Sequence, residues 1–112
     1  MERISESQKE YRDGDWGVKY LIRGPSIEWG VIRLKPGQNL DGHYHEQVEE
    51  TFWLLEGSAI LSVDGEPHHL VAGDAVRLEA KRRHSISNES DQPMKMAFIK
   101  CPYLPKDKVL SS

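Results

Sequence analysis

Two histidines and one glutamate in the middle of the chain have the types and spacing of metal ligands. His43 and His45 are one residue apart, and Glu50 follows shortly after them. In an extended segment, side chains at positions i and i+2 point to the same side, so the two imidazoles would face the same way. Imidazole nitrogens and carboxylate oxygens are ligands of first-row divalent metals. These residues therefore predict half of a metal site with Glu50 as the third donor; the alternative is a chance histidine pair on an exposed strand.

The elements that would position these residues are short strands. Asp64-Gly65 separates two apolar runs and is the strongest hairpin signal in the chain. No apolar stripe with helical spacing persists over several turns, so the chain is predicted to be all-β, as in a jelly-roll barrel or sandwich. Alternating and β-branched residues predict strands at 18–23, 27–34, 51–55, 58–63, 66–71, 75–78, 84–87 and 94–100.

Length, charge and cysteine content restrict the class of protein. A chain of 112 residues has room for one domain with one core. The net charge of −3 and a pI near 5.9 provide no basic field, so no nucleic-acid partner is expected. The apolar runs are too short to cross a bilayer, and no apolar signal region follows the first residues, which predicts a cytoplasmic protein without a membrane partner. Cys101 is the only cysteine, so no internal disulfide can form.

The frame around the two histidines resembles a known pattern. Reading along the chain, there is a glycine, five residues, histidine, one residue, histidine, four residues, glutamate, six residues and glycine, at Gly37, His43, His45, Glu50 and Gly57. This spacing resembles the first motif of the cupin family. The segment His84-Ser85-Ile86-Ser87-Asn88 resembles the end of the second cupin motif, in which histidine is followed by three residues and asparagine. The resemblance extends from about Val18 to Ile99 and is to the small single-domain cupins of the RmlC-like jelly-roll superfamily.

The resemblance implies a double-stranded β-helix with a metal site inside it. His43, His45, Glu50 and His84 would converge from separate strands and bind one divalent transition metal: manganese, iron, nickel, copper, cobalt or zinc. Such a donor set leaves coordination positions open for water or substrate. Glu49 could compete with Glu50, but the motif spacing selects Glu50, and adjacent strand residues point to opposite faces. The alternative is a degenerate cupin whose histidines fill the barrel without a metal.

The chain departs from the cupin pattern just before His84. The family usually has proline, a spacer and glycine there, whereas this chain has Glu79-Ala80-Lys81-Arg82-Arg83. One or two of the cations Lys81, Arg82 and Arg83 would lie at the barrel mouth and bind an anionic substrate, because a carboxylate or phosphate gains from a bidentate arginine partner. The alternative is a solvated charge run.

Two classes of function follow from these observations. The first is a metal-dependent enzyme, dioxygenase-like or isomerase-like, that acts on a small molecule inside the barrel. The second is a binding or sensor module that holds a sugar, a carboxylate or a metal without turnover. Glu56, Glu79 and His69 are the only acid–base candidates that the sequence offers, and none is strongly placed. Their weakness favours binding or dioxygen chemistry over isomerisation.

The remaining segments complete the predicted organisation. Residues 1–17 are expected to form an arm or edge strand, residues 18–100 the cupin barrel, and residues 101–112 a tail that covers a barrel end and frays. His68 and His69 are expected to be exposed, or one of them to support the site. Asn88 is expected to bond to backbone. Several apolar residues exceed the needs of one barrel interior and predict a homodimer, namely Trp29, Val31, Trp53 and Ile60.

Overall fold

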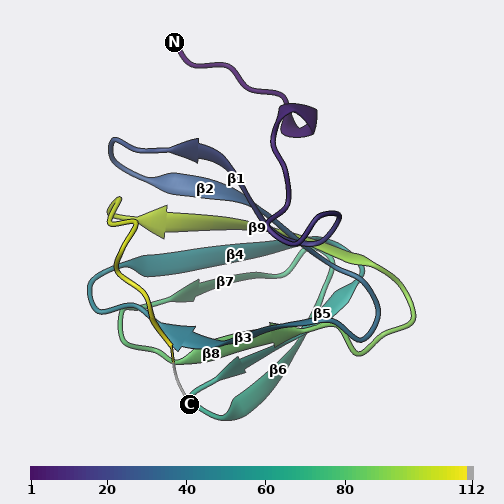
Figure 1. Cartoon of the computed structure of the whole chain (residues 1–112). Coiled ribbons are helices and arrows are strands. Elements are labelled where there is room, and N and C mark those ends of the chain that lie inside the picture. The colour runs from purple at the N-terminus through teal and green to yellow at the C-terminus, as the bar shows by residue number, and fades with distance from the viewer. Residues whose placement is uncertain (111–112) are drawn as a thin grey trace.

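Two antiparallel five-stranded sheets face one another in the computed structural model, which describes residues 1–110 (Figure 1). This confirms the predicted all-β, cupin-type jelly roll. The first sheet has the order β1 (Gly17–Arg23), β2 (Glu28–Leu34), β9 (Met94–Cys101), β4 (Glu49–Glu56) and β7 (Ala75–Leu78). The second sheet has the order β10 (Val109–Leu110), β3 (Asn39–Tyr44), β8 (His84–Ser87), β5 (Ser58–Val63) and β6 (Glu66–Val71). A 3-10 turn, η1 (Glu6–Gln8), precedes them.

The predicted strand ranges agree with eight of these ten strands to within two residues. The hairpin prediction is also correct: Asp64 and Gly65 join β5 to β6, with φ values of 50° and 84°. Two consecutive residues with positive φ give the turn twist that matches a two-residue hairpin. Strand β3 was missed because its sequence is polar and contains a glycine, and its register shifts between Leu40 and His43. Strand β10 was missed because it has only two residues.

The inner face of the first sheet carries residues in rows that run across its strands. One row places Ile32, Met96 and Leu54 side by side, and the next places Gly30, Phe98 and Phe52 side by side. The third row, toward one end of the sheet, is charged and consists of Glu28, Lys100 and Glu50. The apolar rows pack against Leu61 and Ile86 of the second sheet and close one end of the barrel. The charged row lies beyond this core.

Parts of both terminal segments contact the barrel. Near the start, Lys19 donates a hydrogen bond to the Glu6 carbonyl at 3.1 Å, and Lys95 forms an ion pair with the Glu6 carboxylate at 2.7 Å. Near the end, the Asp107 carboxylate accepts hydrogen bonds from the loop that follows β3. Residues 111 and 112, where the predicted tail ends, lie outside the described residues. Within residues 1–110, no helix has the length and apolarity needed to cross a membrane.

Candidate metal centre

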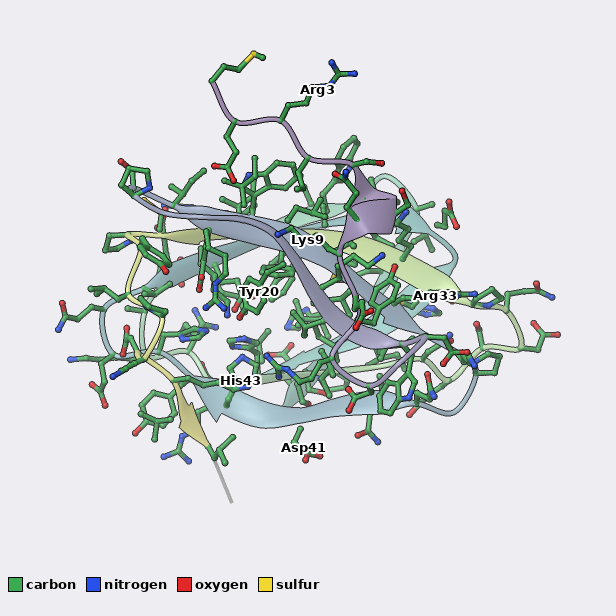
Figure 2. The ribbon with its side chains drawn as sticks, turned by 45° about the horizontal axis from the view of Figure 1, so that its top comes forward. Arg3, Lys9, Tyr20, Arg33, Asp41 and His43 are labelled. Atoms are coloured by element: carbon green, nitrogen blue, oxygen red, sulfur yellow. The ribbon has the colours of Figure 1, made fainter. Side chains whose placement is uncertain are left out.

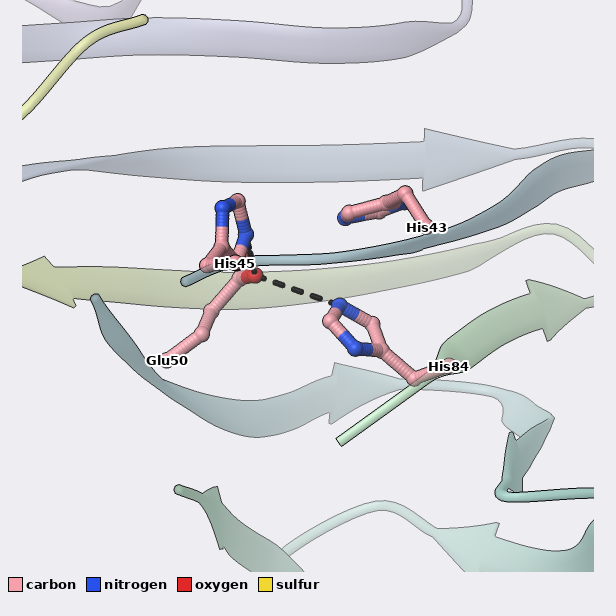
Figure 3. A group of neighbouring side chains, drawn as sticks. All are labelled: His43, His45, Glu50 and His84. Carbon is pink, nitrogen blue, oxygen red and sulfur yellow. Dashed lines mark hydrogen bonds and ion pairs between the residues drawn. The ribbon is translucent and has the colours of Figure 1, made fainter. Parts of the chain in front are cut away.

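The four predicted ligands come from three strands and one loop, and the fold brings them together. His43 lies near the end of β3, His45 follows that strand, Glu50 is the second residue of β4, and His84 opens β8. All four are buried, and one ligand atom from each lies within 4.8 Å of those of the other three (Figure 3). The pairing of His43 with His84 across β3 and β8 places their ring centroids 4.3 Å apart. Glu50 reaches the same point from the opposite sheet.

Backbone carbonyls fix the orientation of all three imidazoles. The Nδ1 atom of His43 lies 3.2 Å from the Asp41 carbonyl, and that of His84 lies 3.0 Å from the Arg82 carbonyl. The Nδ1 atom of His45 contacts the carbonyl of Asp107. A carbonyl oxygen can only accept, so Nδ1 must carry the proton in each ring. A ring held in this orientation presents Nε2 to the cluster, the nitrogen that would bind a metal.

The contacts at Glu50 fit a bound cation. Its Oε1 atom lies 3.1 Å from Nε2 of His45 and 3.3 Å from Nε2 of His84. A lone pair facing a carboxylate oxygen is favourable only if a proton or a metal ion lies between them. Nε2 of His84 is buried and makes no hydrogen bond to any described residue. Three imidazoles and one carboxylate are also the donor chemistry of a first-row divalent ion, so the residues present fit such a metal.

The electrostatics of the cluster keep its members in the forms that ligands require. Burial and, to a smaller extent, the nearby His84 lower the pKa of His43 to about 4, so this ring is neutral at pH 7. Burial alone would raise the pKa of Glu50. The close contacts with the His45 and His84 rings and the positive charge of Lys100 outweigh burial and hold the pKa of Glu50 below its ordinary range. The carboxylate is therefore ionised.

A cavity of about 280 Å³ opens beside the cluster, and His43 and Glu50 form part of its wall. Its deeper wall is apolar and includes Phe52, Ile86 and Phe98. A metal ion held by the four donors would thus face a space that can accept a small molecule. A metal with a position open toward such a cavity could bind a further ligand, in contrast to a closed structural site whose ligands fill the whole coordination sphere.

The same cavity contains two functional candidates that the sequence analysis missed. Tyr20 and Lys100 lie on its wall, and the Lys100 ammonium donates a hydrogen bond to the Tyr20 hydroxyl at 2.9 Å. Figure 2 shows Tyr20 and His43 in the space between the two sheets. A signal for Lys100 was present, because it continues the alternation of Met96 and Phe98 onto the inner face of β9. The cavity therefore offers Tyr20 and Lys100 as acid–base candidates in place of the weakly placed Glu56, Glu79 and His69.

The predicted cations before His84 lie elsewhere. Lys81, Arg82 and Arg83 are exposed and do not line this cavity. Arg82 is bound to Asp64 at 2.5 Å and to Glu79 at 3.1 Å. Substrate binding by the three cations stays a prediction, without a contact to the cavity that supports it.

The turn that contains these cations is held without the proline and glycine that the family uses. The backbone N–H of Lys81 donates to the His45 carbonyl at 2.6 Å, and Lys81 adopts a φ of 72°. The Asp64 carboxylate accepts the backbone N–H of Arg83 at 3.0 Å. These bonds fix the chain on both sides of Arg82, whose carbonyl orients His84.

The other residues singled out from the sequence are placed as follows. His68 and His69 lie on β6 and are both exposed, as are Glu56 and Glu79. Asn88 is buried, and its amide donates to the Leu34 and Gln92 carbonyls at 3.0 and 2.8 Å, in agreement with its predicted bonding to backbone.

The chain is similar in sequence to two characterised bacterial proteins. The chain is 31% identical over 80 residues to the tetracenomycin polyketide synthase protein TcmJ of Streptomyces glaucescens, a match covering 71% of this chain and 54% of that protein. It is 35% identical over 79 residues to gentisate 1,2 dioxygenase 1 of Aquipseudomonas alcaligenes, covering 70% of this chain and 23% of that protein. The chain thus spans about half of TcmJ and under a quarter of the dioxygenase.

Solved structures and a family model complete the comparison. An uncharacterized conserved protein with a double-stranded beta-helix domain from Klebsiella pneumoniae has a TM-score of 0.84 at 19% identity, covering 100% of this chain and 98% of that chain. The family model described as "Cupin domain" matches residues 30–100. With both cupin motifs folded onto one buried cluster in a two-sheet jelly roll, this match shows that the chain belongs to the cupin family.

Proposed function

We propose that this protein is a metal-dependent enzyme that transfers a proton on a small molecule bound in the cavity, as an isomerase-like or lyase-like reaction requires. The observation that carries the proposal is the Lys100–Tyr20 pair on the wall of the cavity that His43 and Glu50 also line. A donor cluster alone would suit storage or sensing of a metal. A proton carrier beside that cluster suits catalysis.

Each group has a separate task in this scheme. His43, His45, Glu50 and His84 hold the metal, which when bound supplies a Lewis acid that polarises a carbonyl or hydroxyl oxygen. Tyr20 accepts a hydrogen bond from Lys100, so its own hydroxyl proton remains free to be donated into the cavity.

The charge of Lys100 supports the same role for Tyr20. An adjacent ammonium stabilises the negative charge that a tyrosine gains when it gives up its proton. The apolar wall formed by residues such as Phe52 and Phe98 excludes water from the reacting atoms, which strengthens these electrostatic effects.

A second candidate is dioxygen chemistry, which the match to gentisate 1,2 dioxygenase 1 favours. The donor set suits iron as well as other first-row metals, and a dioxygenase would consume oxygen during turnover. The two candidate reactions differ in whether Tyr20 is needed. Proton transfer depends on the Tyr20 hydroxyl, whereas oxygen consumption would depend on the bound metal and not on that hydroxyl.

The test begins with elemental analysis of the purified protein. A panel of enolisable carbonyl compounds, hydroxy acids and sugars is then incubated with the metal-loaded protein in D₂O, and deuterium incorporation is followed by NMR with and without oxygen. Proton transfer predicts exchange that does not need oxygen and that Tyr20→Phe slows by about 10²-fold or more, with metal content unchanged. Oxygen uptake that survives this substitution would support the dioxygenase. A metal-loaded protein without exchange, oxygen uptake or turnover would overturn both in favour of a binding or sensor module.

We also propose that the protein acts as a homodimer and retain the expectation of a cytoplasmic location. The outer face of the first sheet supports the dimer, because Trp53 is 53% exposed and Ile99 is 42% exposed there. Two large apolar residues on one solvent-facing sheet favour contact with a second copy. Val31, which the sequence analysis grouped with them, is instead only 5% exposed.

A further inference from the structure

A second cavity of about 140 Å³ adjoins the one beside the donor cluster. Four residues line both cavities: Arg12, Tyr20, Lys100 and Lys108. They come from the N-terminal segment, β1, β9 and the segment before β10, so the fold gathers them from far apart in the chain. Three of the four are cations. The boundary between the cavities is therefore positively charged, and it adjoins the candidate metal centre through Glu50 and His43.

These three cations have no ion-pair partner within 4.0 Å among the described residues. The buried carboxylates nearby are already engaged, since Glu28 is paired with Arg23 at 2.8 Å and Glu50 contacts two histidines. The carboxylates Asp13 and Asp41 also line the larger cavity, but both are exposed and neither reaches a cation.

The cations also repel one another. Partial burial of the Lys108 amino group and the charges of Arg12 and Lys100 lower the pKa of Lys108, although much of this side chain remains in solvent. Holding like charges together costs free energy unless an anion lies between them. Such an arrangement is expected where the protein recognises a negative group that is part of its ligand.

We propose that Arg12, Lys100 and Lys108 bind the carboxylate of a small amphipathic acid, whose uncharged body lies in the larger cavity against Phe52, Ile86 and Phe98. This inference rests on the proposed function, because it names the chemical class of the substrate of that proposed enzyme. The three cations replace Lys81, Arg82 and Arg83 as the anion-binding group suggested by the geometry.

Charge and shape select this class of ligand. A carboxylate with an apolar body is favoured over free phosphate, because only the former can also bury apolar surface against Phe52, Ile86 and Phe98. The apolar wall favours a flat or aliphatic body over a sugar. Phe98 is fixed edge-on to Tyr20, with ring centroids 5.3 Å apart, and so presents a rigid surface. The larger volume of about 280 Å³ restricts the body to a small molecule.

The experiment measures binding of benzoate, benzamide and inorganic phosphate to the zinc-loaded and the metal-free protein by calorimetry. Lys108→Gln and Arg12→Gln remove exposed cations, so the fold should survive, and Lys100→Gln removes the half-buried one. Lys106→Gln is the matched control, since Lys106 lies in the same segment as Lys108 but lines neither cavity. Circular dichroism checks that each variant is folded.

The proposal predicts that benzoate binds about tenfold or more tightly than benzamide, and that Lys108→Gln and Lys100→Gln each weaken benzoate about tenfold. Lys106→Gln should bind benzoate as the parent protein does. Unchanged benzoate affinity in Lys108→Gln and Arg12→Gln would overturn the proposal, as would tighter binding of phosphate than of benzoate. Benzoate binding that appears only with zinc and ignores the cations would assign the carboxylate to the metal instead.

The failure of this proposal can be told apart from failure of the proposed function. Binding is measured without turnover. A protein that shows no activity but still binds benzoate more tightly than benzamide through Lys108 would support the anion site and contradict the proposed enzymatic function. A protein whose proton exchange depends on Tyr20 but whose benzoate affinity does not depend on Lys108 would support the enzymatic function and contradict the anion site. Lys108 makes this separation possible because it is not part of the Lys100–Tyr20 pair.

Discussion

Asp107 should control metal affinity although its side chain does not belong to the donor cluster. Its carboxylate accepts backbone N–H bonds from Glu46, Gln47 and Val48 at 2.9, 2.8 and 3.0 Å. Its carbonyl accepts the Nδ1 proton of His45. The side chain thus fixes the loop that carries His45, and the backbone of the same residue fixes the His45 ring. These bonds also explain the lowered pKa of Asp107, because they outweigh the opposing effect of its burial.

The size of the effect follows from these bonds. A hydrogen bond to a charged acceptor contributes about 1.5–3 kcal/mol, and partial exposure of Asp107 reduces this to about 0.5–1 kcal/mol for each of the three bonds. Asp107→Ala should therefore destabilise the closed loop by about 1.5–3 kcal/mol. If loop closure is required for His45 to bind, metal affinity falls about 10- to 100-fold, which matches the usual cost of losing a group that orients a metal ligand.

The assay is a zinc titration against a competing chelator, with the parent protein, Asp107→Ala and Asp107→Asn. The asparagine variant keeps one acceptor oxygen and should be intermediate. Asp91→Ala serves as the control, because Asp91 is exposed and follows β8 at the end of that strand opposite His84. Equal zinc affinity in Asp107→Ala and the parent protein would refute the reasoning, since it would mean that His45 is oriented without the loop.

Three further predictions test the site, its protonation and its assembly. His84→Ala should lose most of its bound metal, whereas His68→Ala, on an exposed strand, should keep it; equal metal content in the two would contradict the ligand assignment. In the metal-free protein, His43 has a pKa of about 4, compared with an ordinary value of 6.5, so the unfolded state binds the proton more tightly than the folded state does. The free energy of unfolding should therefore fall by about 3 kcal/mol between pH 6.5 and pH 4. The lowered pKa of Glu50 adds to this loss below its ordinary value of 4.5, and urea titrations that give a constant unfolding free energy would exclude both effects. Trp53→Glu should convert a dimer to monomers in sedimentation velocity, and an unchanged sedimentation coefficient would place any interface elsewhere.

Much of the fold follows from local patterns in the sequence, but the site depends on pairing between distant strands. Alternation and turn residues predicted eight strands, because strands such as β5 and β9 alternate between buried and less buried residues and turn residues bound the others. The approach of His84 to His43 depends on β3 pairing with β8, and no local pattern encodes that pairing. The cupin spacing supplied it instead. Lys100 was locally predictable but escaped notice, since a charged residue at the end of an apolar alternation reads as the end of the strand.

The run of cations before His84 illustrates why charge in a sequence is a weak guide to a binding site. Arg82 makes two kinds of contact that need no substrate. Its side chain forms ion pairs with Asp64 and Glu79, and its carbonyl accepts a hydrogen bond from Nδ1 of His84. Asp64 in turn belongs to the β5–β6 hairpin and also accepts the backbone N–H of Arg83. The turn that precedes His84, the fourth candidate metal donor, is thus held against a hairpin by ion pairs and hydrogen bonds. Arg82 forms ion pairs with neighbouring carboxylates, whereas Arg12, Lys100 and Lys108 form none within residues 1–110. That difference is visible only after folding.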